Sequence, residues 1–587
     1  MADDQVEAPV AVAPEPVRAP PVLDSAHIGD IKGALGTIRL DDVGPRGSWR
    51  GRLTALLAIM GPGLIVMVGD NDAGGVATYA QAGQNYGTSL LWVLLLLIPV
   101  LIVNQEMVVR LGAVTGVGHG RLILERFGRF WGAFSIVALF VLNFLTIVTE
   151  FIGIAFALSY LGVSKDVSVP VAGLLLVAMT MTGSFQKWER AMFVFVAGNL
   201  LIIPLAVYSH PHAAAMVHGS FIPGVAGGIN SSSVLLIIAM VGTTVAPWQL
   251  FFQQSNVIDK RITTRWINYE RADTVIGSFV VVSGAALLIA AAAFPFAHTA
   301  LHGHFSNAEA VARGLEHTVG HTAGVLFALV LLNASIIGAG AVTLATSYAF
   351  GDVFGIHHSL HRPPSEAKVF YGSFAAIVGA ACGIVLIPGA PLGVVTVAVQ
   401  ALAGVLLPSA SVFLLLLCND KQVLGPWVNK PWLNVLATAI LGVLFMLSGI
   451  LVVTTVFPSV NVTALLLALS GALAGVADIG ERLEVDNERM RANFDATNGL
   501  IVAEAVSLTL AGKLGKPIAD QVMDEAIQKA VAEKRHLRDI LGEDERVTLL
   551  MNPGEIARLF EPLSFQGVSQ TFIERLVASA QSRVPRR

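Results

Sequence analysis

Long apolar stretches separated by short polar connections dominate the chain between residues 53 and 457. A helix needs about 20 apolar residues to cross a bilayer. The pattern therefore predicts an all-α polytopic membrane protein over residues 51–457. The predicted spans are Leu53–Ala82, Ser89–Val109, Phe130–Leu161, Val169–Gly183, Ala191–Tyr208, Ser232–Phe252, Val275–Phe296, Ala323–Phe350, Val369–Ile387, Val394–Leu417 and Leu433–Phe457.

The two ends of the chain have a different pattern. Residues 1–50 hold acidic residues and several prolines, which predicts a disordered tail and no cleaved signal. Residues 458–480 carry no charge before Asp478 and form either a twelfth span or a linker. From Glu481 the pattern is charged and helical, so residues 481–587 are predicted to be a soluble helical segment. Its predicted helices are Arg482–Asn493, Leu500–Leu514 and Asp520–Glu533.

Basic residues crowd alternate connections, beginning with Arg46, Arg50 and Arg52 before the first span. Because cytoplasmic loops carry the excess of Lys and Arg, the N-terminus is expected in the cytoplasm and the chain in the inner (plasma) membrane. With a twelfth span the soluble segment would also be cytoplasmic. We favour that topology because the segment has no export signal of its own.

Composition excludes several classes of protein. Hydrophobic residues make up 54% of the 587 residues and charged residues 13%, about half the share of a soluble chain. The net charge of -4 argues against nucleic acid as a partner. Cys382 and Cys418 both lie in apolar runs, which disfavours disulfides and thiolate metal sites. The expected partner is the lipid bilayer, and no cofactor is expected.

The first span is interrupted by Gly-Asp-Asn-Asp-Ala-Gly-Gly at Gly69–Gly75. A charged side chain at this depth is costly unless it faces a cavity or a partner, which makes it a functional-site hypothesis. Glycines let the backbone leave the helix and free carbonyl groups. Carboxylate and carbonyl oxygens are ligands of hard cations. Asp70, Asn71 and Asp72 are therefore candidate metal ligands.

A second interruption lies five spans later. Met67-Val68-Gly69 at the first break is repeated as Met240-Val241-Gly242, followed by Thr-Thr-Val-Ala-Pro at Thr243–Pro247. Two interrupted spans at corresponding positions of two halves indicate a midplane substrate site in an inverted-repeat transporter. Five spans per half give the halves opposite orientations. The carbonyl groups near Thr243 join the candidate ligands.

At these residues the chain resembles the NRAMP divalent-metal transporter family, from about Leu53 to Lys430. Four further motifs carry the resemblance: Gly61-Pro62-Gly63, Ala80-Gln81-Ala82-Gly83, Arg110–Gly116 and Glu150-Phe151-Ile152-Gly153. The resemblance implies a LeuT-like fold of five-plus-five inverted repeats with broken helices 1 and 6. It also implies transport by alternating access.

The chain departs from the family pattern at the site itself. Asp72 is kept, but Gly75 stands where the family has an asparagine ligand. The other departures are Ala246 for the methionine, Trp248 and Gln253 for two histidines, and Ile147 for an aspartate. Loss of the thioether removes the ligand that favours softer ions, and the smaller residues are expected to widen the cavity. Loss of Asp and His removes obvious proton carriers.

This pattern looks like the NRAMP-related magnesium transporter branch. Mg²⁺ usually keeps several waters and binds through one or two carboxylates, which suits a wide site around Asp72 with Asp70 or Asn71. We therefore expect uncoupled Mg²⁺ transport, with Mn²⁺ as a second ion. The alternative is a proton-coupled Mn²⁺/Fe²⁺ symporter with a modified site.

Other polar residues are candidates for the transport pathway: Gln105, Glu150, Trp248 and Gln253. Glu150 either faces the ion or pairs with a neighbouring helix, and Gln105 either faces the ion or bonds another helix. Asp70 either attracts cations from a vestibule or caps a helix at the break. The loop histidines are expected to have no specific role.

The C-terminal segment resembles the C-terminal part of the fumarase/aspartase superfamily, closest to carboxymuconate cycloisomerase and adenylosuccinate lyase. The resemblance is carried by Leu483–Asp486, Arg489–Asn493, Ala503-Glu504-Ala505 and Leu559–Pro562. The family's catalytic loop motif does not occur, so we expect no enzyme but a fused remnant or helical interaction module. Two alternative functions belong to other classes of protein: a lyase-type enzyme that acts through this segment, and a metal-sensing receptor, for which no signalling domain is visible.

Overall fold

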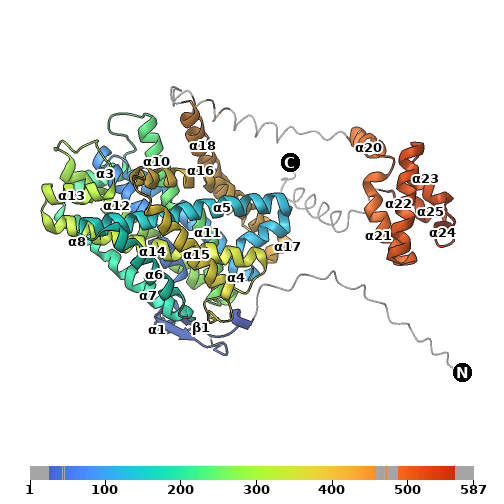
Figure 1. Cartoon of the computed structure of the whole chain (residues 1–587), viewed down its shortest axis with the longest axis horizontal. Helices are drawn as coiled ribbons and strands as arrows, with labels where there is room; N and C mark the ends of the chain where they lie inside the picture. Colours follow the sequence, from blue (N-terminus) through green and yellow to red (C-terminus); the bar gives the residue numbers. More distant parts are fainter. Residues whose placement is uncertain are drawn as a thin grey trace, which may run out of the picture. The chain divides into compact units, whose positions relative to one another are not determined.

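The computed structural model describes residues 25–42, 44, 46–457, 465, 468, 471 and 487–561. It divides into two compact units, Met1–Ala474 and Gly475–Arg587, here called the membrane unit and the C-terminal unit (Figure 1). Apart from residues 465, 468 and 471, the predicted extra span or linker over residues 458–480 lies outside the described residues. The choice between eleven and twelve spans therefore stays a prediction.

The membrane unit is a bundle of helices joined by short connections (Figure 1). Its first half comprises α1 (Trp49–Ile59), α2 (Pro62–Val68), α3 (Ala73–Tyr86), α4 (Leu91–Thr115), α5 (His119–Tyr160), α6 (Lys165–Thr180), α7 (Phe185–Gly198), η2 (Asn199–Leu201) and α8 (Ile202–Tyr208). The second half comprises α9 (Ala213–Phe221), α10 (Ser231–Thr244), α11 (Pro247–Asp259), η3 (Thr264–Trp266), α12 (Ile267–Phe296), α13 (Ala308–Thr318), α14 (His321–Phe354), α15 (Lys368–Val385), α16 (Leu392–Asn419), α17 (Lys421–Leu424), η4 (Gly425–Trp427) and α18 (Pro431–Val456).

Each of the eleven predicted spans coincides with one or more of these helices. Within the described residues, nine helices are long and apolar enough to cross a membrane, and the pair α1–α2, bent by 56°, makes a tenth. The eleventh, α6, has 16 residues. Helix α5 begins earlier than predicted because it continues through a kink at Gly128, whose φ of 83° suits glycine.

Both predicted breaks are present. Helix α2 ends at Val68 and α3 restarts after Asp72, while α10 ends at Thr244 and α11 restarts at Pro247. Proline is tolerated there because the first residue of a helix has no intrahelical N–H partner. Helix α12 packs along α2, α3 and α4, and α14 packs along α5 and α11, so both breaks are enclosed by other helices.

The prediction of a disordered tail over residues 1–50 is wrong for the second half of that segment. Residues 25–38 form η1 (Ser25–His27) and an antiparallel hairpin of β1 (Ile31–Gly33) and β2 (Gly36–Ile38). Ile31 and Ile38 pair across the hairpin and pack on α1, which buries their apolar side chains. Residues 1–24 lie outside the described residues.

The C-terminal unit is helical, as predicted. It comprises α20 (Asn487–Asp495), η5 (Leu500–Val502), α21 (Ala503–Leu514), α22 (Lys516–Glu533), α23 (Leu537–Glu543), α24 (Glu545–Thr548) and α25 (Pro553–Arg558) around its own apolar core. The predicted helix start at Asn552 is confirmed, because its side chain and that of Glu555 form a reciprocal capping box. Helix α22 begins four residues before the predicted Asp520, since Pro517 fits its first turn.

Candidate metal site at the two helix breaks

Three polar side chains of the first break are buried inside the bundle. Asp70, Asn71 and Asp72 have exposed fractions of 0%, 3% and 2%. Asp72 is the N-cap of α3, and its Oδ1 accepts a hydrogen bond of 2.6 Å from the backbone N–H of Gly75. The helix cap considered for Asp70 thus belongs to Asp72, which places its carboxylate at the positive end of α3.

Glu150 on α5 completes a pair of carboxyl groups with Asp72. Its Oε2 accepts a hydrogen bond of 3.1 Å from the backbone N–H of Ala73, the residue that follows Asp72. Glu150 is completely buried, and its Oε1 has no protein partner among the described residues. Glu150 therefore bonds a neighbouring helix, as one alternative predicted, and it does so at the residue next to Asp72. Whether it also faces the ion stays a prediction.

The space over Gly75 is not the wide cavity that the sequence suggested. A side chain there would begin 2.8 Å from the carbonyl oxygen of Asp70 and 3.1 Å from Thr243 Oγ1. Both distances are shorter than ordinary van der Waals contact, so glycine allows the two breaks to approach each other. The expectation that Gly75 enlarges the site is wrong, because neighbouring oxygens occupy the room that an asparagine would need.

The second break supplies backbone groups and neutral oxygens. Ala246, with 4% of its surface exposed, is the N-cap of α11 but has no capping side chain. Thr243 is also buried, and its hydroxyl has no hydrogen-bond partner among the described residues. The first N–H groups of α11 therefore lack a capping side chain beside the site.

A chain of amide groups connects the two breaks. Gln249, one turn into α11, donates a hydrogen bond from Nε2 to Asp70 Oδ1. Its Oε1 accepts a hydrogen bond of 3.2 Å from Gln105 Nε2 on α4. Gln105 thus bonds another helix, which is one of its two predicted alternatives, and it reaches Asp70 only through Gln249.

Three of the predicted residues contact groups other than Asp72. Asn71 donates 3.2 Å from Nδ2 to the carbonyl of Val281 on α12. Trp248 packs on Gly69 and on Phe252. Gln253 donates 2.9 Å to Thr274 Oγ1, a full turn below Gln249, so it joins another polar group.

Two residues of the site were missed by the sequence analysis. Gln249 directly follows Trp248, but it is not one of the positions at which the chain departs from the family pattern. Gln400 of α16 lies against Gly74, is 2% exposed, and has an Nε2 without a partner among the described residues. A single amide in the apolar run of α16 is the signal that could have identified it.

A buried ionic network holds the end of α1 and the start of α2, which precede the first break. Asp273 Oδ2 accepts hydrogen bonds from the N–H groups of Gly61 (3.0 Å) and Gly63 (2.8 Å) at the start of α2. Lys260, after α11, donates to the carbonyls of Ile59 (2.7 Å) and Met60 (2.8 Å). It also pairs with Glu189 of α7 at 2.6 Å. The network links both half-helices at one end of the bundle.

The chemistry of the site is that of oxygen. The side chains that converge at the breaks are Asp70, Asp72, Glu150 and Thr243, and Asp70 Oδ2 has no partner among the described residues. The described part of the chain contains no cluster of three His, Cys, Asp or Glu side chains that could hold a metal. The arrangement therefore offers few direct ligands, with carbonyl and hydroxyl oxygens around two or three carboxyl groups.

A helical membrane bundle in which two interrupted helices meet at a buried polar centre defines a secondary transporter. The Natural resistance-associated macrophage protein-like (Nramp) family matches residues 63–454, and the chain belongs to that family. The divalent metal cation transporter MntH of Staphylococcus aureus strain Mu3 is 28% identical over 423 residues, 68% of this chain and 91% of the relative. The MntH of strain JH9 is 27% identical over the same length.

Solved structures agree with this membership. A mutant of the Eremococcus coleocola manganese transporter has a TM-score of 0.58 at 19% identity, covering 77% of this chain and 98% of that chain. This likeness confirms the predicted all-α, LeuT-like fold with broken helices 1 and 6. The relatives of the membrane unit are transporters, in agreement with the prediction that the chain is not an enzyme.

The C-terminal unit matches a different family, as its motifs predicted. The adenylosuccinate lyase C-terminus family matches residues 499–576. The 3-carboxy-cis,cis-muconate cycloisomerase of Bradyrhizobium diazoefficiens is 51% identical over 117 residues, which are 20% of this chain and 26% of that enzyme. The chain thus spans about a quarter of that enzyme's length. The role of the C-terminal unit as a fused remnant or interaction module stays a prediction.

Proposed function

We propose that the chain transports divalent metal cations across the plasma membrane by alternating access, with Mg²⁺ as its main substrate and Mn²⁺ as a second one. In this proposal the N-terminus is cytoplasmic and transport is not coupled to protons. The names of the MntH relatives support a divalent metal cation as substrate. The single observation that carries the choice of ion is the oxygen chemistry at the two breaks.

The ligands available at the two breaks are hard oxygen donors, and hard donors favour a hard cation. Asp72, Asp70 and the hydroxyl of Thr243 offer oxygen, and Ala246 offers no sulfur. Carboxylate, carbonyl and water ligands suit Mg²⁺ and Mn²⁺, whereas thioether and thiolate ligands select softer ions. Because few protein ligands converge, the ion would keep part of its hydration shell, which Mg²⁺ gives up reluctantly.

The anchoring network suggests how access could alternate. The start of α2 is held by Asp273, and the carbonyls at the end of α1 are held by Lys260. In this proposal, these bonds close the bundle at the end where α1 and α2 meet. Opening toward this side would require the α1–α2 segment to leave Lys260, while the carboxylates at the break stay with the ion.

Proton-coupled Mn²⁺/Fe²⁺ symport is the second candidate, and one observation favours it. Glu150 bonds the Ala73 N–H next to Asp72, so two buried carboxyl groups lie at the same end of α3, and like charges so placed favour binding of a proton or a cation. A divalent ion that binds Asp72 would then displace that proton. A carboxyl pair thus remains available for protons although the family's histidine and aspartate positions have changed.

Reconstituted protein distinguishes the two candidates. Liposomes would report Mg²⁺ and Mn²⁺ uptake and luminal pH in the same preparation, with Asp72→Asn as the inactive control. We expect Mg²⁺ uptake that Mn²⁺ inhibits, without acidification of the lumen. Mn²⁺ uptake with acidification and no Mg²⁺ flux would overturn the proposal and support the symporter.

A further inference from the structure

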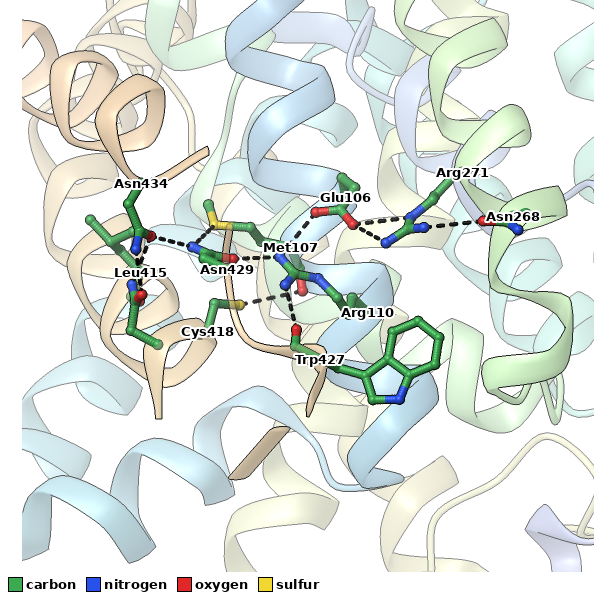
Figure 2. Close-up of polar contacts among 11 residues, drawn as sticks. Glu106, Met107, Arg110, Asn268, Arg271, Leu415, Cys418, Trp427, Asn429 and Asn434 are labelled. Carbon is green, nitrogen blue, oxygen red and sulfur yellow. Dashed lines mark hydrogen bonds and ion pairs between the residues drawn. The ribbon is translucent and has the colours of Figure 1, made fainter. Parts of the chain in front are cut away.

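A second polar pocket lies outside the ion site, between the end of α4, the start of α12 and the connection from α17 to α18. It encloses about 680 Å³. Its charged lining residues are Glu106, Arg110, Arg271 and Lys430. Figure 2 shows that Glu106, Arg110 and Arg271 come together from α4 and α12. Three cations thus accompany one carboxylate among the described residues that line this pocket.

The carboxylate is already used by two of the cations. Glu106 Oε2 accepts from Arg110 Nη2 at 3.1 Å, and its Oε1 accepts from Arg271 Nε at 3.0 Å and Nη2 at 2.6 Å. Glu106 therefore faces this pocket, whereas its neighbour Gln105 faces the ion site. Because Glu106 compensates only one positive charge, the pocket keeps an excess of about two, and Lys430 is exposed at its rim.

Arg110 organises the wall of the pocket. Its Nη1 donates 2.6 Å to the carbonyl of Trp427, and its Nη2 donates 2.5 Å to Asn429 Oδ1 (Figure 2). Its side chain is 5% exposed, and its Nε has no hydrogen-bond partner among the described residues. A buried guanidinium with an unused N–H in a pocket of positive charge is suited to an anionic oxygen.

The rest of the pocket is apolar and aromatic. Ile102, Val103 and Leu433 form part of its wall, together with Trp427 and with Trp432, which is 63% exposed. Arg110 lies in the last two turns of α4, Arg271 lies near the start of α12, and Lys430 directly precedes α18. Tryptophan at helix ends with basic residues is typical of the membrane interface.

We propose that this pocket binds the headgroup phosphate of an anionic phospholipid. The phosphate would lie between the ammonium of Lys430, the guanidinium of Arg271 and the unused Nε–H of Arg110, and the apolar wall would hold the first part of an acyl chain. Basic pockets between transmembrane helices bind anionic headgroups in this way. The apolar wall and the position at helix ends favour a lipid over free phosphate, which would need only the cations.

Native mass spectrometry of the purified full-length chain tests the site. Phosphatidylglycerol and phosphatidylcholine would be titrated separately, and inorganic phosphate would be added in excess in a second arm. The test variant is Lys430→Gln, and its matched control is Lys421→Gln, an exposed lysine of the same connection outside the pocket. Both changes lie on the surface, so both variants should fold.

We expect the wild type to retain phosphatidylglycerol and not phosphatidylcholine, and Lys430→Gln to weaken retention about fivefold, as a lysine near an anionic lipid surface would. Lys421→Gln should match the wild type. Equal retention of the two lipids, or equal loss in both variants, would overturn the proposal. Displacement of the lipid by inorganic phosphate would instead identify a free anion as the occupant.

Discussion

The two broken helices of the membrane unit are both interrupted inside the bundle, but the two breaks differ in length and in chemistry. The break between α2 and α3 carries Asp70, Asn71 and Asp72, all buried. The break between α10 and α11 consists of Val245 and Ala246, and its polar partners Thr243 and Gln249 lie in the flanking helices. One break supplies the negative charge, and the other supplies shape and neutral oxygens.

This difference separates binding of a cation from the choice of cation. The charge of Asp72 attracts any divalent ion, because Coulomb attraction does not depend on softness. The ligand type at position 246 decides whether a soft donor takes part. Substitutions at the first break should therefore abolish transport, and substitutions at the second break should change which ion is carried.

Replacement of Asp72 by asparagine should have the largest effect. Asparagine is as good an N-cap as aspartate, so Asp72→Asn keeps the cap on α3 while it removes the charge. We expect loss of cation uptake by a factor of at least about 100 in liposomes, since a ligand and its charge are lost together. The unfolding temperature in detergent should change by only a few degrees.

The control for this change is Asp166→Asn, because Asp166 is exposed in the first turn of α6. It should transport at the wild-type rate. Uptake by Asp72→Asn at more than a tenth of the wild-type rate would show that the charge of the first break is not required.

Replacement of Lys260 tests the anchor that holds both half-helices. Lys260→Met leaves Glu189 buried without its 2.6 Å partner and frees the carbonyls of Ile59 and Met60. Removal of one partner of a buried ion pair typically costs about 3–5 kcal/mol. We expect a correspondingly lower unfolding temperature, measured by the fluorescence of the protein in detergent.

Two comparisons make this result specific. Lys187→Met changes an exposed lysine on the same helix as Glu189 and should leave the unfolding temperature unchanged. The double variant Lys260→Met with Glu189→Leu removes both charges and should recover part of the loss. If the double variant is no more stable than Lys260→Met, the ion pair is not the cause.

The connection after α14 is anchored to that helix differently, through a titratable residue. Burial lowers the pKa of His358, but the Asp352 carboxylate, 3.1 Å away, outweighs this effect and raises the pKa to about 9. Since this value lies above the unfolded value of 6.5, the stabilisation is complete below pH 6.5 and is lost as the pH rises through 9. The difference corresponds to at most about 3 kcal/mol.

Unfolding temperatures between pH 6 and pH 10 test this anchor. The wild type should lose stability over the upper part of this range, and His358→Gln should lose less because it cannot titrate. His302→Gln, an exposed loop residue, should follow the wild type. Parallel curves for His358→Gln and the wild type would contradict the assignment.

The sequence was informative about elements and less so about contacts. Apolar runs of bilayer length predicted the eleven spans, and glycine, aspartate and proline predicted both breaks, because these signals are local. Glu150 was placed near the site only as an alternative. Its hydrogen bond to the Ala73 N–H joins residues 77 positions apart, and no local pattern encodes it.

Two errors have physical causes. The expected widening at Gly75 assumed that a smaller side chain leaves a void, but the Asp70 carbonyl and Thr243 Oγ1 approach into that space. The tail before α1 was predicted to be disordered from its composition. Ile31 and Ile38 alternate with polar residues in a hairpin too short to be recognised, and their burial depends on α1.

The smallest predicted effect concerns the choice of ion at the second break. Ala246→Met would place a thioether at the N-cap of α11, beside the carboxylates of the first break. We expect uptake of Cd²⁺ or Mn²⁺ to rise relative to Mg²⁺ by about tenfold, because sulfur stabilises softer ions. Ala246→Leu is the matched control, since leucine has a similar volume without sulfur. If both variants shift selectivity equally, size and not softness at position 246 chooses the ion, and the charge of Asp72 would then act within a site whose selectivity is set by space.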